Sequence, residues 1–289
     1  MSSKKTVTIR HLLKVTQTWF AEKGISSARL DAEVLLAKAL GIERLGLYLD
    51  MDRPLSEQET ATYREMVRRR GKKEPVAYIV GQKEFYGIDI DVACGVLIPR
   101  PDTEHLVELA LSLLPKETEA TAVDVCTGSG CVAIALAKNR PLLSLWATEI
   151  DDQAYKIAIG NIEKYALKDR IQCLQGSYLT PCPKALKVDL LVGNPPYVFE
   201  EALADLEPDV KDFEPSLALL GLGEDALGCH RDILKQGVDF VRPEGHALLE
   251  IGYDQGDSVQ MLKVEGWTFI ELHYDLSGHP RVAQWRRDD

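Results

Sequence analysis

The stretch AVDVCTGSG, residues 122–130, decides the fold of this chain. Its apolar half, 122–125, predicts a short buried strand, and the run 131–139 that follows the glycines predicts a helix. Glycines at such a strand-to-helix turn let the backbone approach a ligand closely, and the first turn of the helix offers unpaired N–H groups. The stretch therefore predicts an α/β fold with a ligand-binding loop at the end of a strand.

A second apolar strand, 142–148, is closed by Glu149. A carboxylate at this strand end is placed to accept hydrogen bonds from both hydroxyls of a ribose. Residues 128–133 also satisfy the dinucleotide pattern G-x-G-x-x-A, with an acidic residue about 20 positions further on. The glycine loop and Glu149 alone are therefore compatible with two classes of enzyme, one that depends on a nicotinamide cofactor and one that binds a methyl donor.

The tetrapeptide NPPY, residues 194–197, separates these two classes. It follows the apolar run 188–192 and fits the methylation of a planar nitrogen, whose lone pair is delocalised. The Asn194 side-chain oxygen can accept one N–H, and a backbone carbonyl held by the Pro195-Pro196 pair can accept the second. Tyr197 can pack its ring against the flat group. A hydride-transfer site has no use for this arrangement.

The rest of the body repeats strand and helix. The strand candidates are 121–125, 142–148, 171–175, 188–192, 246–251, 268–273 and 281–285. The first four alternate with helical segments, which predicts right-handed crossovers and a parallel sheet, whereas the last two are close together and are expected to be antiparallel. Because ligands bind at the carboxyl ends of such strands, the glycine loop, Glu149 and Asn194 should converge on one edge of the sheet.

The first part of the chain has a helical pattern. Apolar residues recur at helical spacing in 9–20 and 27–40, and Ser56 to Glu59 form a capping box for a third helix. After Gly81, apolar and polar residues alternate, and this pattern predicts a hairpin. We expect a small helical domain at 1–83 and a catalytic domain at 84–289, joined by a hairpin within 84–98.

Charge and composition narrow the class of protein further. Lys and Arg outnumber Asp and Glu by 16 to 10 in residues 1–83, but are outnumbered by 35 to 18 in 84–289. An acidic catalytic domain matches a phosphate backbone poorly, which argues against a bulk nucleic-acid substrate. We interpret the basic run 68–73 as the C-terminus of a helix capped by Gly71.

The lack of a recognisable targeting segment and the spacing of the cysteines predict a cytoplasmic protein. No apolar run reaches the ~18 residues of a membrane span, and residues 1–6 lack the apolar stretch of a signal peptide. The six cysteines show no C-x-x-C spacing and are interpreted as reduced thiols. The histidines are scattered without ligand spacing, so no metal site is expected.

Several motifs together resemble the release-factor glutamine methyltransferases. They are EPVAY at 74–78, GQKEFYG at 81–87, LIPRPDTE at 97–104, the glycine loop, NPPY at 194–197, FEP at 213–215 and GHPRV at 278–282. The resemblance covers nearly the whole chain and implies a class I S-adenosylmethionine-dependent methyltransferase with a seven-stranded, Rossmann-like sheet. Such enzymes methylate the side-chain amide of the glutamine in the Gly-Gly-Gln tripeptide of peptide-chain release factors, and leave S-adenosylhomocysteine.

The resemblance also implies roles for single residues. Asn194 would contact both donor and substrate, and Glu149 would hold the donor ribose. Tyr178 would lie beside the adenine. The methionine part would be cradled by Cys126, Thr127, Gly128, Ser129 and Gly130, and the glutamine slot would be shaped by Pro195, Pro196 and Tyr197, with Asn194, Pro195 and Tyr197 catalytic.

Cys126 departs from the pattern, because many relatives have glycine there. A negative φ at this position would make the side chain tolerable, whereas a positive φ would put donor affinity in doubt.

The expected reaction is direct in-line attack of the amide nitrogen on the sulfonium methyl, with alignment as the main source of catalysis. Expected partners are class I release factors, with the helical domain recognising the substrate and the enzyme acting as a monomer, without membrane or obligatory nucleic acid. A ribosomal-protein glutamine or an adenine in nucleic acid are alternative acceptors, and an inactive binding protein is a further class.

Overall fold

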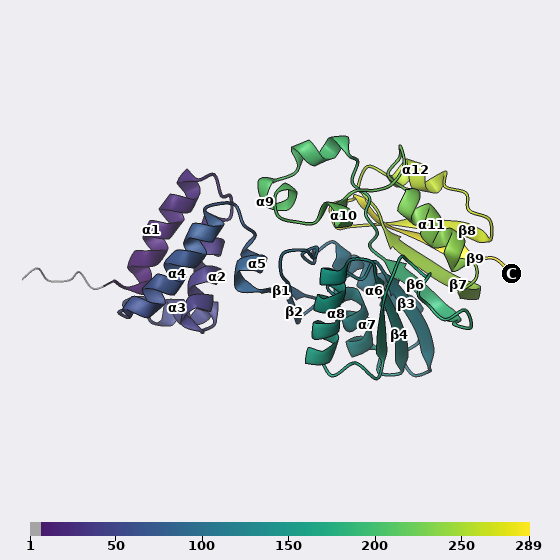
Figure 1. Cartoon of the computed structure of the whole chain (residues 1–289), viewed down its shortest axis with the longest axis horizontal. Coiled ribbons are helices and arrows are strands. Elements are labelled where there is room, and N and C mark those ends of the chain that lie inside the picture. Colours follow the sequence, from purple (N-terminus) through teal and green to yellow (C-terminus); the bar gives the residue numbers. More distant parts are fainter. Residues whose placement is uncertain (1–6) are drawn as a thin grey trace, which may run out of the picture. The chain divides into compact units, whose positions relative to one another are not determined.

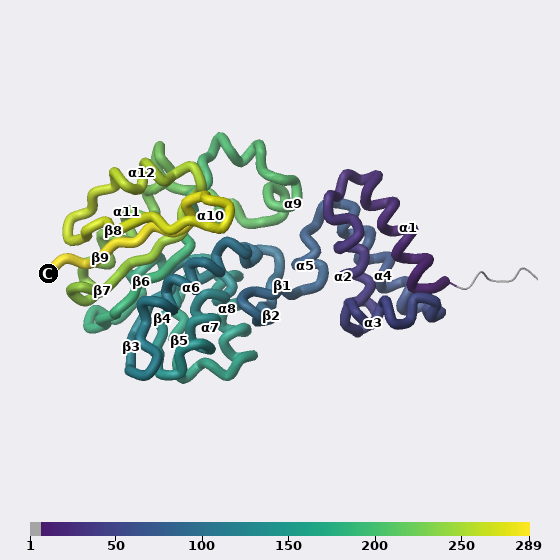
Figure 2. Tube along the Cα trace, turned by 180° about the vertical axis from the view of Figure 1, so that it is seen from behind, coloured from purple at the N-terminus to yellow at the C-terminus, as the bar shows by residue number. Residues whose placement is uncertain are grey.

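The computed structural model describes residues 7–289, which divide into two compact units (Figures 1 and 2). The first unit contains the described residues up to Gly81 together with Glu207–Phe213, and the second contains Gln82–Leu206 and Glu214–Asp289. The inclusion of Glu207–Phe213 in the first unit was not foreseen from the sequence. The N-terminal stretch of the first unit ends at Gly81, two residues before the expected boundary, because Gly81 adopts a φ of 80° after the helix at Val76–Val80 and a strand begins at Gln82.

The first unit is helical. Its helices are α1 (Ile9–Glu22), α2 (Ala28–Leu40), α3 (Arg44–Leu49), α4 (Glu57–Arg70), α5 (Val76–Val80) and α9 (Pro208–Lys211). The predicted capping box is confirmed: the Ser56 hydroxyl accepts from the Glu59 N–H, and the Glu59 carboxylate accepts from the Ser56 N–H. Leu35, Leu36 and Phe20 are fully buried in the core of this unit.

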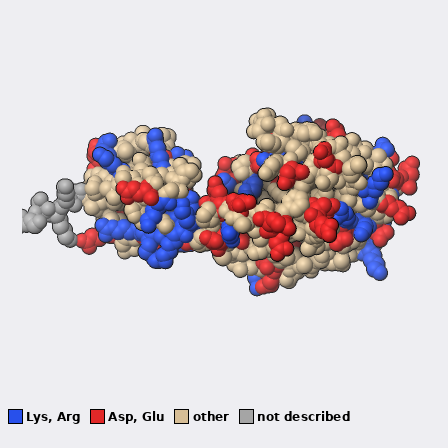
Figure 3. All heavy atoms as spheres, turned by 90° about the horizontal axis from the view of Figure 1, so that it is seen from above, with Lys and Arg blue, Asp and Glu red and all other residues tan. Residues whose placement is uncertain are grey.

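The basic run 68–73 is largely paired within the helical unit. Arg69 pairs with Glu74 at 2.5 Å, and the buried Arg70 pairs with Asp31 at 2.6 Å. Lys and Arg nevertheless gather on the visible face of this unit, as the blue spheres in Figure 3 show. Gly71 is the C-cap of α4 but has a φ of −62°, so its lack of a side chain serves close packing instead: a Cβ there would lie 2.1 Å from the Trp19 ring.

The second unit opens with a two-stranded antiparallel hairpin. Its strands are β1 (Gln82–Phe85) and β2 (Ile88–Asp91), so the strands occupy an earlier position than the expected 84–98. Phe85 and Ile90 are buried, which explains the alternation seen in the sequence.

A seven-stranded sheet forms the centre of this unit, in the order β5-β4-β3-β6-β7-β9-β8. Its strands are β3 (Ala120–Val125), β4 (Leu143–Glu149), β5 (Ile171–Gln175), β6 (Val188–Gly193), β7 (Val241–Glu250), β8 (Trp267–Tyr274) and β9 (Pro280–Arg287). The parallel arrangement of β3 to β6 and the antiparallel pairing of β8 with β9 confirm the sequence prediction. β7 is a further parallel strand beside β6.

Helices precede and connect these strands. They are α6 (Thr103–Leu113), α7 (Cys131–Asn139), α8 (Asp152–Lys164), η1 (Glu201–Asp205), α10 (Ser216–Leu219), α11 (Gly228–Gly237) and α12 (Gly256–Gln260). Trp285, only 1% exposed, is the largest fully buried side chain of this unit's core. Across residues 7–289, no helix combines the length and the apolar character needed to span a bilayer.

Candidate functional site

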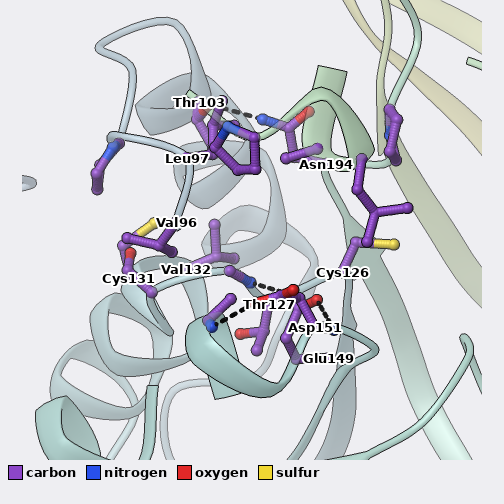
Figure 4. Close-up of a pocket in the computed structure, with 18 of the residues that line it drawn as sticks. Val96, Leu97, Thr103, Cys126, Thr127, Cys131, Val132, Glu149, Asp151 and Asn194 are labelled. Atoms are coloured by element: carbon purple, nitrogen blue, oxygen red, sulfur yellow. Dashed lines mark hydrogen bonds between the residues drawn. The ribbon is translucent and has the colours of Figure 1, made fainter. Parts of the chain in front are cut away.

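A pocket lies at the carboxyl ends of β3, β4 and β6 (Figure 4). Five segments of the second unit contribute its lining, and they lie within 95–103, 124–132, 149–154, 194–196 and 215–218. The three motifs that the sequence placed on one edge of the sheet are therefore brought together in one cavity.

The glycine loop is anchored from below by Asp124, the fifth residue of β3. The Asp124 Oδ2 accepts a hydrogen bond of 2.5 Å from the Thr127 hydroxyl and one of 3.2 Å from the Ala133 N–H at the start of α7. Gly128 and Gly130 both adopt positive φ, at 57° and 81°. One buried carboxylate thus fixes both ends of the loop, and the glycines allow it to turn.

The Asp124 carboxyl is fully buried, and this burial raises its pKa to about 7. The two hydrogen bonds oppose the shift but do not cancel it. Because the folded pKa lies above the ordinary value of 3.8, the folded state holds a proton that the unfolded state releases between these two pH values.

We expect Asp124→Asn to alter the pH dependence of stability. Between pH 4 and 7 the wild-type protein loses a contribution on the order of 4 kcal/mol as pH rises, since one pKa unit corresponds to about 1.4 kcal/mol. The variant lacks this titration, so its free energy of unfolding relative to wild type should rise over the same interval. Urea unfolding at several pH values measures this difference. The exposed Asp152→Asn is the control, and parallel pH curves for wild type and Asp124→Asn would contradict the assignment.

Glu149, the last residue of β4, ties the glycine loop to the next strand. Its Oε2 accepts from the Gly128 N–H and its Oε1 accepts from the Asp151 N–H, both at 2.9 Å. The residue lines the pocket and is only 8% exposed, and this burial raises the pKa of its carboxyl. Each oxygen keeps a further lone pair that can accept from a ligand hydroxyl.

Cys126 occupies the left-handed region of the backbone, with φ at 56°. The sequence left two outcomes open at this position, and the structure gives the one in which a side chain carries a conformational cost. The side chain is half-buried and packs against the hydrophobic core of this unit, and burial raises the pKa of its thiol well above the usual value. Cys126 also lines the pocket.

We expect Cys126→Val to destabilise the protein by about 2 kcal/mol, because a β-branched side chain fits the left-handed region poorly. Donor affinity should fall with it, since the residue begins the glycine loop. Cys173→Val is the matched control, because Cys173 lies in β5, where a β-branched residue suits the strand. Urea unfolding and titration calorimetry with S-adenosylmethionine check both effects, and equal stabilities of the two variants would refute the strain at Cys126.

The tetrapeptide 194–197 follows β6 directly. The Asn194 Nδ2 donates to the Thr103 hydroxyl oxygen at 3.3 Å, as the dashed line in Figure 4 shows. No donor among residues 7–289 is paired with the Asn194 side-chain oxygen. Pro196 also lines the pocket. The amide of Asn194 is thus held by its nitrogen, and its oxygen is available to accept an N–H.

Four residues singled out in the sequence do not line this pocket. Gly130 is the N-cap of α7, and Pro195 lies between two lining residues. Tyr197 donates its hydroxyl to Glu250 at 3.1 Å. Tyr178, with a φ of 48°, packs against the core, and burial raises the pKa of its hydroxyl.

The structure adds residues that sequence reasoning did not assign to the site. Thr103 and Arg100 line the pocket, and Arg100 pairs with the buried Glu214 at 2.6 Å. Leu217, more than half exposed, lies at the same cavity. The runs 97–104 and 213–215 were noted only as family motifs, although an arginine and a glutamate in two such runs already signal a possible ion pair. Across the described part of the chain, no group of three or more His, Cys, Asp or Glu is arranged to hold a metal ion.

The sheet order and the pocket define the class I fold of S-adenosylmethionine-dependent methyltransferases. Solved structures with this fold include the hMettl16 catalytic domain in complex with a MAT2A 3′UTR hairpin, with a TM-score of 0.55 and 17% identity over 74% of this chain and 81% of that one. A methyltransferase from Pyrococcus furiosus gives a TM-score of 0.53 and 15% identity over 72% of this chain and 92% of that one.

Sequence comparison identifies the family of the chain within this fold class. The model of the PrmC N-terminal domain matches residues 11–81, and that of the methyltransferase small domain matches residues 104–206. The release factor glutamine methyltransferase of Geobacter sulfurreducens is 41% identical over 96% of each chain, and that of Moorella thermoacetica is 38% identical over 98% of this chain and all of the other. The chain belongs to the release factor glutamine methyltransferases.

Proposed function

We propose that this protein transfers a methyl group from S-adenosylmethionine to the side-chain amide nitrogen of the glutamine in the Gly-Gly-Gln motif of peptide-chain release factors. The observation that carries the proposal is that Asn194 presents a free amide oxygen in the same pocket as the glycine loop and Glu149. The names of the full-length relatives support the choice of acceptor.

The donor is held by the loop and the acid beside it. Cys126, Thr127, Gly128, Ser129 and Gly130 cradle its methionine part, and Glu149 accepts hydrogen bonds from its ribose. Burial supports the second role, because a hydrogen bond to a charged acceptor is stronger where water is excluded. Tyr178 follows β5 at the same edge of the sheet, and we assign it to the adenine side of the site.

The acceptor amide is aligned by the tetrapeptide 194–197. S-adenosylmethionine supplies an activated methyl on a sulfonium. The Asn194 oxygen accepts one N–H of the substrate glutamine, and a carbonyl of the Pro195-Pro196 segment accepts the other. Both acceptors stabilise the positive charge that grows on the nitrogen as it loses conjugation, so positioning replaces a strong base. Pro196 and the Tyr197 ring shape the slot for the flat amide.

The choice of a release-factor glutamine as the acceptor implies the partners of the protein. The protein acts on class I release factors in the cytoplasm as a monomer, needs no nucleic acid, and uses its N-terminal region, residues 1–83, for substrate recognition. The excess of basic residues in that region provides charge for an acidic partner surface.

Mass spectrometry tests the proposed function directly. A release factor is incubated with this protein and S-adenosylmethionine, beside a factor in which alanine replaces the Gly-Gly-Gln glutamine. We expect one added methyl on the first and none on the second. Absence of a methyl on both factors, with donor binding confirmed, would contradict the proposal and redirect the search to a ribosomal-protein glutamine or to adenine in nucleic acid.

A further inference from the structure

Helix α8 packs against β2 (Figure 1) and carries a fully buried amide side chain, that of Asn161. Asn161 is 0% exposed and does not line the pocket. Asparagine is a weak helix former, and a buried amide costs free energy unless its polar atoms are paired. The partners of Asn161 therefore explain why this residue type lies inside a helix.

The partners of the Asn161 amide are main-chain groups of two residues far apart in the sequence. Its Oδ1 accepts from the Asp91 N–H, and its Nδ2 donates to the Asp91 carbonyl, both at 2.9 Å. Nδ2 also donates to the Ser129 carbonyl at 2.9 Å. A main-chain N–H only donates and a carbonyl only accepts, so these three hydrogen bonds fix the orientation of the amide. Asn161 thus joins the end of β2 to the glycine loop.

The hydrogen bond to Ser129 fixes one peptide plane of the glycine loop. The carbonyl of this plane, on Ser129, accepts from Asn161. Its N–H, on Gly130, donates to the Thr127 carbonyl at 2.9 Å. Gly130 has a φ of 81°, but a glycine adopts other backbone angles as readily, so it does not hold the plane by itself. Removal of the Asn161 amide would leave the buried Ser129 carbonyl without this partner.

The other partner, Asp91, leads into a second wall of the pocket. Asp91 ends β2, and the chain that follows lines the pocket within 95–103. Helix α8 holds this segment at a further point, because the Gln153 Nε2 donates to the Cys94 carbonyl. Gly95 has a φ of 98°, and a Cβ there would lie 2.6 Å from the Gln153 side chain. The backbone of this wall therefore packs directly on α8.

We propose that α8 clamps two walls of the donor pocket together, with Asn161 and Gln153 as positioning residues for S-adenosylmethionine. Asn161 fixes the glycine loop, and Gln153 fixes the segment that begins at Gly95. The inference rests on the proposed function in one respect, that the glycine loop holds the donor. It goes further because it assigns donor affinity to two side chains that do not line the pocket.

Loss of the Asn161 amide should lower donor affinity through the shape of the free loop. A Ser129 carbonyl without a partner gains free energy by turning toward another donor or toward water. Binding must then restore the original peptide plane, and the fraction of molecules in the competent conformation limits the apparent affinity. Chemistry takes place in the restored loop, so kcat at saturating donor should stay within about threefold of wild type.

Asn161→Leu tests the contact with the glycine loop, because leucine is similar in size and has no hydrogen-bonding groups. We expect its Kd for S-adenosylmethionine, measured by titration calorimetry, to rise about tenfold, the order for one buried acceptor left unpaired. Ile162→Ala is the control. Ile162 is the next residue of α8, is 3% exposed, and its truncation lowers stability without removing a side-chain hydrogen bond.

Thermal unfolding and calorimetry separate positioning from general destabilisation. Both variants should unfold at a lower temperature than wild type, but only Asn161→Leu should bind the donor more weakly. An equal rise in Kd for Ile162→Ala would show that loss of stability alone weakens binding, and would overturn the role of Asn161.

Gln153→Ala tests the second contact at an exposed position, where the substitution does not threaten folding. We expect its Kd for S-adenosylmethionine to rise about fivefold, the order for one net hydrogen bond. Gln260→Ala is the matched control, because Gln260 is exposed on α12 and bonds its own helix through the Gly256 carbonyl. This test holds independently of the stability of Asn161→Leu, and a Kd within about twofold of wild type in Gln153→Ala would overturn the clamp.

Failure of this inference is distinguishable from failure of the proposed function, because calorimetry with the donor alone needs no release factor. A wild-type protein that binds the donor but methylates no release factor contradicts the proposed function. A wild-type protein that methylates the factor, with unchanged donor affinity in Asn161→Leu and Gln153→Ala, contradicts only the clamp. A wild-type protein that binds no donor overturns both.

Discussion

Asn194→Ala is expected to lower kcat for release-factor methylation by about 100-fold to 1,000-fold, the usual cost of removing one hydrogen-bond partner that acts on developing charge. In the proposed mechanism the variant loses the oxygen that accepts the substrate N–H, and alanine offers no acceptor in its place. The fold should stay intact, because within residues 7–289 the Asn194 side chain hydrogen-bonds only to the Thr103 hydroxyl. Single-turnover methylation with saturating donor measures the loss.

The same substitution at Asn139 is the control. Asn139 ends α7 and bonds its own helix through the Ala135 carbonyl, away from the pocket lining. Asn139→Ala should therefore turn over at nearly the wild-type rate. Near-normal turnover by Asn194→Ala, with unchanged thermal unfolding, would remove Asn194 from the mechanism.

The second large effect is expected on donor binding. Glu149→Ala should raise the Kd for S-adenosylmethionine by about 100-fold, because the two charge-assisted hydrogen bonds proposed for the ribose would be lost at a carboxylate that is only 8% exposed. The substitution also frees the Gly128 and Asp151 N–H groups, which the carboxylate holds in place. Both consequences act on the donor before any chemistry, so kcat at saturating donor should change much less than Kd.

Titration calorimetry with S-adenosylmethionine gives the affinity directly. Glu163→Ala serves as the comparison, since Glu163 is exposed on α8 and pairs with Lys168 away from the pocket. A donor affinity equal to wild type in Glu149→Ala would show that the ribose is held elsewhere.

Much of the fold was predictable because its signals are local. Apolar runs marked each strand, glycines marked the loop at 126–130, and a capping box marked the start of α4. The alternation of strands and helices then implied a parallel sheet, and the parallel sheet implied that the loop, Glu149 and Asn194 share one edge. Boundaries were less certain: the hairpin begins at Gln82, because the turn at Gly81 ends α5 directly before it.

The sequence by itself determined the order of the elements, the edge of the sheet that carries the pocket and the residue types that occupy it, because each depends on neighbours along the chain. Only the tertiary structure decided that Asn194 meets Thr103, 91 positions away, and that Tyr197 meets Glu250, 53 positions away. It also decided the positive φ of Cys126. The physical reason is that such contacts depend on strand order, register and packing, which bring distant residues together and leave no mark in any local pattern.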